Sequence, residues 1–193
     1  MAAQISEGEN LAIDPRNVTQ RVPAAWRALR VAKQSDEDHA CGLFAFVTAA
    51  RMLGCVGDDE DVHKLLGRLD PADSARIRFR LPTVGLYEKD IRALAKSVGL
   101  SVYRPNLREM AQFHEPGWIW MAFVLVRFTS PDGIVTSASH YVLILDYLAT
   151  EAVLVVADPH PWNRDVYCVP EEQFEAAWLG AKDPPWAAAV HKY

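Results

Sequence analysis

The hydrophobic pattern of this chain changes character part-way along, and this change restricts the fold more than any other feature. In the first part, apolar residues recur at helical spacing, as in 41–53, 58–69 and 85–100. From residue 118 onward, the apolar runs are short and rich in β-branched and aromatic residues, as in 118–128, 139–148, 152–159 and 165–169. Helices followed by strands, rather than helices alternating with strands, favour an α+β fold with an antiparallel sheet.

The ends of several helices are marked in the sequence. Residues 41–53 predict a buried helix closed by Gly54, because glycine readily adopts the left-handed conformation that ends many helices. The spacing of Ile91, Leu94, Ala95 and Val98 predicts a further helix that ends at Gly99, and residues 170–180 predict a short helix after the strands. The polar stretch that begins at Pro71 is interpreted as a linker between two helices.

Two of the predicted strands, 141–147 and 152–157, have similar lengths and are joined by a short polar turn. If these strands pair antiparallel, His140 at the start of the first and Asp158 at the end of the second lie at the same end of the hairpin. The sequence therefore predicts that an imidazole and a carboxylate lie side by side.

Length and composition exclude several classes of protein. The chain has 193 residues, half of them apolar, which suits one domain with a core of its own. The net charge is −5 and no Lys/Arg cluster stands out, so we expect no nucleic-acid ligand. Three cysteines do not form a disulfide framework, and no secretory signal or membrane-spanning stretch is visible. These features predict a cytoplasmic protein without a membrane partner. They leave its oligomeric state open.

Cys41 is the residue with the most distinctive chemical setting. It begins the predicted buried helix, where unpaired backbone N–H groups and the helix dipole stabilise a thiolate. Such a thiolate is a nucleophile, and His140 is placed to act as its base. Asp158 would fix the tautomer and orientation of His140. The amide of Gln34 is a candidate donor to an oxyanion.

The same residues carry a resemblance to a known family. The matching segments are QSDEDHACG (34–42), GLYEKDIRALAKSVGL (85–100), SHYVLILD (139–146), VVADP (155–159) and EQFEAAWLG (172–180). In this order they resemble the papain-like cysteine peptidases, and more narrowly the C39-like family of double-glycine or bacteriocin-leader peptidases, as a stand-alone domain.

That resemblance implies a papain-like fold over residues 34–193, preceded by an N-terminal arm of residues 1–33. It implies a bacterial cysteine peptidase, with Cys41 as nucleophile, His140 as base, Asp158 as orienting residue and Gln34 as oxyanion donor. The substrate would be a peptide or protein, and no cofactor or metal would be needed.

Three positions depart from the family pattern. Ala40 stands where an aspartate usually precedes the cysteine, Leu43 replaces a common proline or alanine, and Gln34 lies one residue further from the cysteine than usual. Two alternatives therefore stay open. One is an acyltransferase or glutamine deamidase that uses the same triad, and the other is an inactive papain-like interaction module.

Other polar residues are interpreted as structural. Cys55 and Cys168 lie at a helix end and in a strand, where a free thiol is commonly a small packed side chain. His39 is expected to line the cleft or to cap, and His160 to lie near the cleft mouth. No spacing typical of a zinc site connects the histidines and cysteines.

Overall fold

A computed structural model of the chain describes residues 11–18, 21–34, 40–81, 85–105, 109–114, 118–181 and 185–192. Its α-helices are α1 (Cys41–Met52), α2 (Val62–Gly67), α3 (Pro71–Arg80), α4 (Glu88–Ser97) and α5 (Glu171–Ala181). Two short 3-10 helices are η2 (Ala24–Trp26) and η3 (Met110–His114). Its strands are β1 (Leu100–Tyr103), β2 (Ile119–Thr129), β3 (Val135–Leu148), β4 (Val153–Ala157), β5 (Val166–Pro170) and β6 (Ala187–Lys192).

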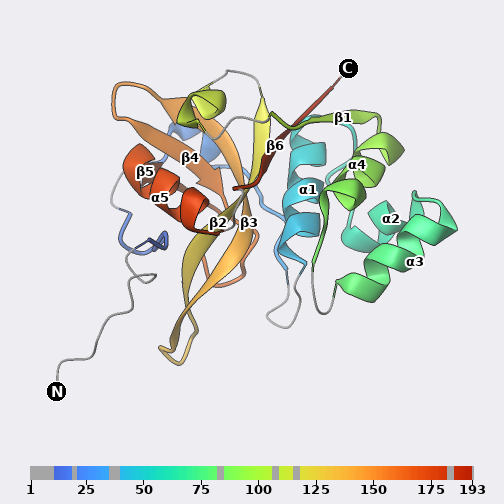
Figure 1. The fold of residues 1–193 in the computed structure, drawn as a ribbon, viewed down its shortest axis with the longest axis horizontal. Helices are drawn as coiled ribbons and strands as arrows, with labels where there is room; N and C mark the ends of the chain where they lie inside the picture. Colours follow the sequence, from blue (N-terminus) through green and yellow to red (C-terminus); the bar gives the residue numbers. More distant parts are fainter. Residues whose placement is uncertain are drawn as a thin grey trace.

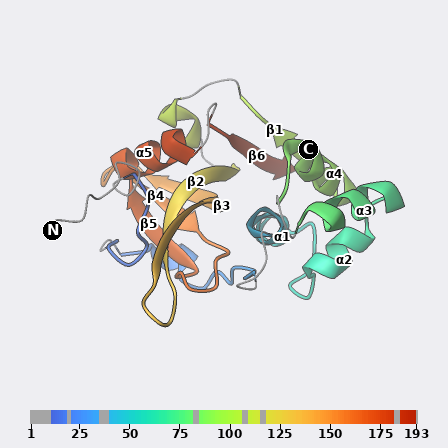
Figure 2. The same cartoon turned by 60° about the horizontal axis from the view of Figure 1, so that its bottom comes forward.

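The strands form one antiparallel sheet in the order β1-β6-β2-β3-β4-β5. Helices α1 to α4 lie together on one side of the molecule, and α5 covers the sheet on the other side (Figures 1 and 2). The predicted α+β class is confirmed, because the helices precede the central strands in the chain and the sheet is antiparallel. In the described part of the chain, no helix has the length and apolar character needed to cross a bilayer.

The predicted hairpin of β3 and β4 is also confirmed. Leu143 pairs with Ala157 near one end and Leu148 with Val153 at the other, although a bulge interrupts the register after Ile144. All residues of β4 are buried, as expected for a short apolar strand inside a sheet. β3 begins at Val135, earlier than the predicted strand, because its first residues pair with β2 alone. His140 therefore lies within β3, just before the part that pairs with the end of β4.

The interpretation of the stretch after Pro71 as a linker was wrong, because this stretch forms helix α3. The Asp70 side chain accepts hydrogen bonds from the N–H groups of Ala72 and Asp73, and Pro71 occupies the first turn. These are ordinary helix-start signals. They were overlooked because α3 buries only Ile77 completely and lacks a continuous apolar face.

Helix α2 is shorter than the predicted 58–69. Its N-cap is Asp61, whose side chain accepts a hydrogen bond from the backbone of Lys64, so the acidic residues before it lie outside the helix. An aspartate that binds the free N–H groups of the first turn fixes where a helix begins.

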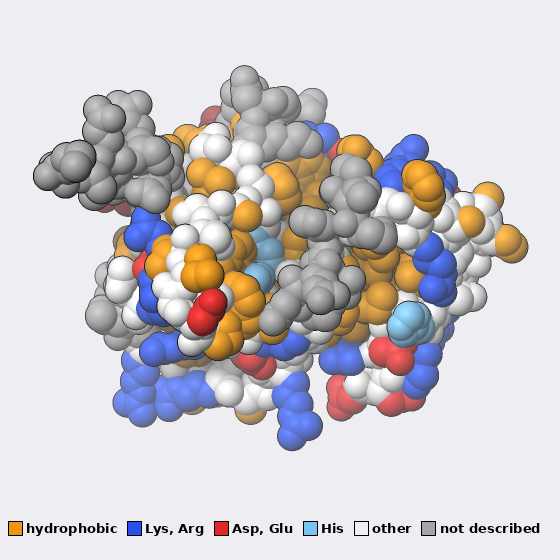
Figure 3. Space-filling view, turned by 90° about the horizontal axis from the view of Figure 1, so that it is seen from below, with side chains coloured by type: hydrophobic (Ala, Val, Ile, Leu, Met, Phe, Trp, Pro, Cys, Tyr) orange, Lys and Arg blue, Asp and Glu red, His pale blue; other side chains and the backbone are white. Residues whose placement is uncertain are grey.

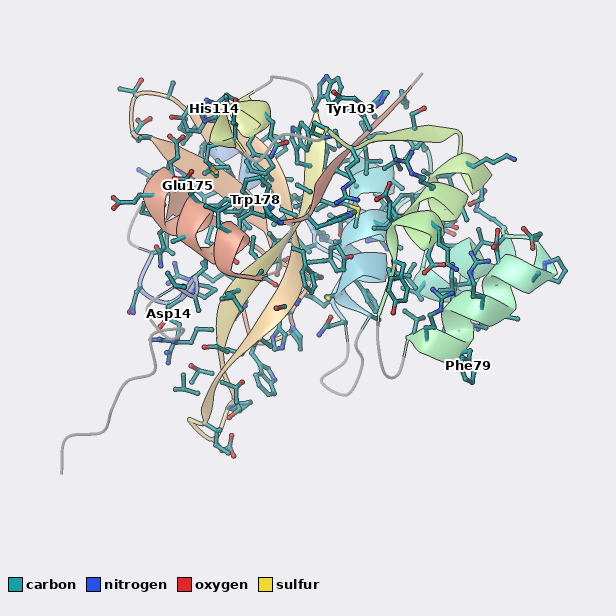
Figure 4. The ribbon with its side chains drawn as sticks, viewed as in Figure 1. Asp14, Phe79, Tyr103, His114, Glu175 and Trp178 are labelled. Atoms are coloured by element: carbon teal, nitrogen blue, oxygen red, sulfur yellow. The ribbon has the colours of Figure 1, made fainter. Side chains whose placement is uncertain are left out.

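Strand β6 was missed entirely. Gly180 and the Asp-Pro-Pro run at 183–185 mark the end of the preceding helix, but the alanines that begin β6 are weak strand formers. It nevertheless fills the space between β1 and β2, and it is tied to α5 by a hydrogen bond from the Trp178 indole to the carbonyl of Trp186. Trp178 lies between α5 and the sheet (Figure 4), so pairing and packing decide the conformation of this segment.

The segment before α1 packs against the sheet and against α1. Ile13 is completely buried and forms an isolated parallel bridge with Val126 of β2. Further along, the N–H of Ala32 donates to the hydroxyl of Thr48 in α1. Residues 31–34 are thereby held between α1 and the loop that follows β4.

Candidate active site

Cys41 occupies the first position of α1 and is partly exposed. No described side chain caps this helix start, so its N–H groups stay available to a negative charge. Burial disfavours the thiolate, but the charge and hydrogen bond of His140 and the N–H groups of Tyr141 and Gly42 outweigh it. Together they lower the pKa of the Cys41 thiol. The cysteine is therefore placed as an activated thiol.

His140 lies between the thiol and a carboxylate. It is 3% exposed, and its Nε2 lies 2.9 Å from Oδ1 of Asp158. The imidazole also hydrogen-bonds Cys41, which leaves Nδ1 as the nitrogen directed at the thiol. Burial disfavours the imidazolium, but the charges of Asp158 and Cys41 raise the pKa of His140 to about 10.

Asp158 is completely buried, and each oxygen of its carboxylate accepts two hydrogen bonds. Oδ1 accepts from His140 and from the N–H of His160, at 2.9 and 2.8 Å. Oδ2 accepts from Asn163 and from the hydroxyl of Tyr167, both at 2.8 Å. Burial opposes ionisation, yet these partners lower the pKa of Asp158 to about 2. The residue is a fixed anion that orients the imidazole.

Lys33 holds the loop that carries Asp158, a role that sequence reasoning missed. Its ammonium donates to the carbonyls of Asp158, His160 and Asn163, at 2.9, 3.1 and 3.1 Å, and pairs with Asp165 at 3.1 Å. One cation thus gathers three carbonyls of the same turn. The position of this lysine directly before Gln34 was the available signal, but a lone lysine in a polar segment gives no indication of its partners.

Gln34 lies beside the same loop. Its N–H donates to the carbonyl of Pro159 at 3.0 Å, and the residue is 9% exposed. The Oε1 atom of its side chain is buried and has no hydrogen-bond partner among the described residues. The amide is therefore held next to the Asp158 end of the site, with hydrogen-bonding capacity left over.

Tyr141 forms a wall beside Cys41 and Gly42. A Cβ added to Gly42 would lie 2.9 Å from the Tyr141 ring, so the second residue of α1 must be glycine for the ring to fit. The Tyr141 hydroxyl donates to the carbonyl of Leu86 at 3.1 Å. Burial raises the pKa of Tyr141, so it acts as a neutral structural group.

The other histidines and cysteines selected from the sequence do not join this hydrogen-bonded chain. His160 stacks on Phe128 and meets the His140 ring edge-on, with ring centroids 5.7 Å apart. His39 lies outside the described residues. Burial raises the pKa of Cys168, which makes it a poor nucleophile. Among the described residues, no group of three or more His, Cys, Asp or Glu side chains is arranged to hold a metal ion.

The space-filling view in Figure 3 shows one face of the molecule on which histidine atoms lie in a hollow bordered by hydrophobic side chains. The structure thus brings together three of the residues selected from the sequence, Cys41, His140 and Asp158, in one hydrogen-bonded chain. Gln34 lies beside the Asp158 end of this chain. A thiol, an imidazole and a carboxylate in series are the groups needed for nucleophilic acyl transfer.

Among the known proteins compared with this chain, the matches are solved structures of similar fold. No family model matches the sequence, and no curated protein matches it. Among solved structures, the peptidase domain of Streptococcus ComA, a bifunctional ABC transporter involved in quorum sensing, superposes with a TM-score of 0.58. The match has 16% identity and covers 86% of this chain and 99% of that domain.

A second match is a double-glycine motif protease from an AMS/PCAT transporter, with 12% identity and a TM-score of 0.48. It covers 86% of this chain and 94% of that structure. At such identities only the fold can be compared, and the conclusion rests on the first match. The chain has the α+β, papain-like fold of the ComA peptidase domain.

Proposed function

We propose that this protein is a cysteine peptidase in which Cys41 is the nucleophile, His140 the general acid and base, and Asp158 the orienting residue. The observation that carries the proposal is the hydrogen-bonded chain from the Asp158 carboxylate through the His140 ring to the Cys41 thiol. The lowered thiol pKa and the raised imidazole pKa favour a thiolate–imidazolium pair at neutral pH.

In the first half of the reaction, the Cys41 sulfur attacks the carbonyl carbon of a peptide bond. The carbonyl oxygen becomes an oxyanion, which the N–H groups at the start of α1 and the Gln34 amide would stabilise. His140 then gives its proton to the departing amine, and a thioester remains on Cys41.

In the second half, His140 takes a proton from a water molecule that attacks the thioester. The carboxylic acid product leaves and Cys41 is regenerated. Asp158 stays ionised throughout, because its role is to hold one imidazole nitrogen so that the other faces the sulfur.

Peptide substrates are supported by the fold shared with the ComA peptidase domain. The test is cleavage of a peptide mixture of defined sequences by the native chain, with new termini mapped by mass spectrometry. The matched controls are Cys41→Ala and Cys168→Ala. We expect cleavage by the native chain and by Cys168→Ala, and none by Cys41→Ala.

The same experiment separates hydrolysis from acyl transfer. Addition of a simple primary amine such as methylamine reports an acyltransferase if the amide of that amine forms in place of the acid. Absence of any new terminus or adduct, with Cys41 as unreactive as the other thiols, would instead indicate an inactive interaction module.

A further inference from the structure

A cavity of about 500 Å³ has Tyr141 and Leu86, the two residues packed against Gly42, in its wall. It is lined by Arg80, Leu86, Tyr87, Glu88, Lys89, Arg104, Tyr141 and Trp186. These residues come from the end of α3, the start of α4 and the residues before it, the segment after β1, strand β3 and the segment before β6. The cavity is separate from the chain of catalytic groups described above.

Tyr141 contacts both this cavity and the residue next to Cys41. Its ring packs on Gly42, next to Cys41, while its hydroxyl reaches Leu86 in the cavity wall. Trp186 meets the Tyr141 ring edge-on, with centroids 5.2 Å apart. The cavity therefore shares the Tyr141 wall with the residue next to Cys41.

Positive charge dominates the surroundings of the cavity. Glu88, the carboxylate in its wall, is already bound by Arg92 and Arg104. The buried Asp90, just behind the wall, is bound by Arg76 and Arg80. Arg76 also pairs with Asp73. Positive groups therefore outnumber carboxylates around the cavity: the former are Arg76, Arg80, Arg92, Arg104 and Lys89, and the latter are Asp73, Glu88 and Asp90. A local positive excess on a chain of net charge −5 requires an explanation.

Lys89 is the cation that the fold itself does not require. It is exposed, and it forms no ion pair or hydrogen bond with another described residue. It also lies in the first turn of α4, where the helix dipole disfavours a positive charge. Its ammonium is therefore free to bind an anion that enters the cavity.

We propose that this cavity, called here the Lys89 pocket, binds an acidic side chain of the peptide substrate next to the cleaved bond. Lys89 and the partly neutralised Arg104 would bind the carboxylate, and the apolar walls formed by Leu86 and Trp186 would pack against its methylene groups. This inference rests on the proposed peptidase function, because it names the side chain that accompanies the reacting carbonyl.

The first test compares two alkylating reagents of matched shape, bromoacetyl-glutamate and bromoacetyl-glutamine, by the rate at which each modifies Cys41 in the full chain. The glutamate-to-glutamine rate ratio cancels the intrinsic reactivity of the thiol. We expect the ratio to fall roughly threefold in Lys89→Gln and about tenfold in Lys89→Glu, as for an exposed ion pair lost or reversed.

The matched control is Lys96→Glu, which makes the same charge change at the other end of α4, and its ratio should stay within about twofold of the native value. A ratio that is unchanged in Lys89→Glu would overturn the inference. That result would assign any preference for the acidic reagent to His140, and the proposed peptidase function would be unaffected.

A second measurement keeps the test independent of thiol chemistry. Binding of N-acetylglutamate and N-acetylglutamine to the Cys41→Ala chain is followed by NMR at the indole N–H of Trp186, assigned with Trp186→Phe. We expect tighter binding of the glutamate, and loss of this preference in Lys89→Glu. Equal binding of the two would refute the Lys89 pocket. A clear preference together with an inert Cys41 would support the pocket and refute the peptidase function.

Discussion

Replacement of Asp158 by asparagine separates the charge of this residue from its hydrogen bonds. The amide oxygen of the new side chain can take the place of Oδ1 and accept from His140 and the His160 N–H. The amide nitrogen then replaces Oδ2, where the Tyr167 hydroxyl can turn to accept and the Asn163 amide can flip. Every partner is kept, and only the negative charge is lost.

Asp158→Asn should therefore lower the unfolding free energy only slightly, but it should clearly reduce the activation of the Cys41 thiol. Exchange of charge-assisted for neutral hydrogen bonds costs about 1–2 kcal/mol of unfolding free energy. Attraction between the carboxylate and the imidazolium over roughly 4 Å is about 4 kcal/mol at an effective dielectric of 20. Repulsion between the carboxylate and the thiolate over roughly 7 Å offsets about 2 kcal/mol of this.

The remaining 2 kcal/mol or so lowers the equilibrium ratio of the thiolate–imidazolium pair to the neutral thiol–imidazole pair roughly 30-fold. Only the thiolate reacts, so the rate of iodoacetamide alkylation at Cys41 should fall, by at most about 30-fold.

The assay is site-resolved alkylation at pH 5, with urea unfolding of the same samples. Asp158→Ala is the comparison variant, because it leaves four buried donors without their acceptor and should cost about 4 kcal/mol or more. Alkylation of Asp158→Asn at the native rate would refute the reasoning, since the carboxylate would then contribute nothing to the charge of His140.

Three further substitutions test the parts around this chain. Lys33→Met removes the cation shared by three carbonyls and should lower the unfolding free energy by about 2–3 kcal/mol in urea titrations, with Lys33→Arg closer to the native chain; equal stability of the Met variant would contradict its role in holding the loop. Gln34→Ala should lower the peptide cleavage rate about 100-fold while alkylation of Cys41, which forms no oxyanion, changes less than about twofold; parallel losses in both assays would show that Gln34 acts on the thiol instead. Gly42→Ala forces a Cβ against the Tyr141 ring and should cost about 1–3 kcal/mol in thermal or urea unfolding despite the better helix propensity of alanine; a variant as stable as the native chain would show that the ring moves freely.

The catalytic elements could be predicted from the sequence because their signals are local. The run from Cys41 to Gly54 has apolar residues at helical spacing and ends in a glycine. The bounds of α1 agree with this run to within two residues. The apolar part of β3 that follows His140 and the short strand β4 that precedes Asp158 are joined by a tight turn, so their pairing brings these two residues together.

The missed elements depend on contacts between distant residues. Strand β6 is a run of alanines whose conformation is decided by its pairing with β1 and β2. Helix α3 is held by Arg76 and Arg80, which bind the buried Asp90 of α4. Neither partner is visible in the local pattern.

The same limit applies to the site. The thiol, imidazole and carboxylate were selected because each begins or ends an apolar element. Lys33 was not, because its importance lies in three carbonyls more than a hundred residues away in the chain. The Lys89 pocket likewise combines α3, α4 and the segment before β6, which only the folded chain brings together.

The central claim is that Cys41 is a thiolate activated by His140. Its most direct test is site-resolved alkylation of the native chain and of His140→Ala by iodoacetamide from pH 5 to pH 9. Because the pKa of Cys41 is lowered and that of Cys168 is raised, Cys41 should react fastest and stay reactive as the pH falls. In His140→Ala that reactivity should be lost at low pH. Reaction of Cys41 no faster than Cys55 and Cys168, with the pH dependence of an ordinary thiol, would contradict the account.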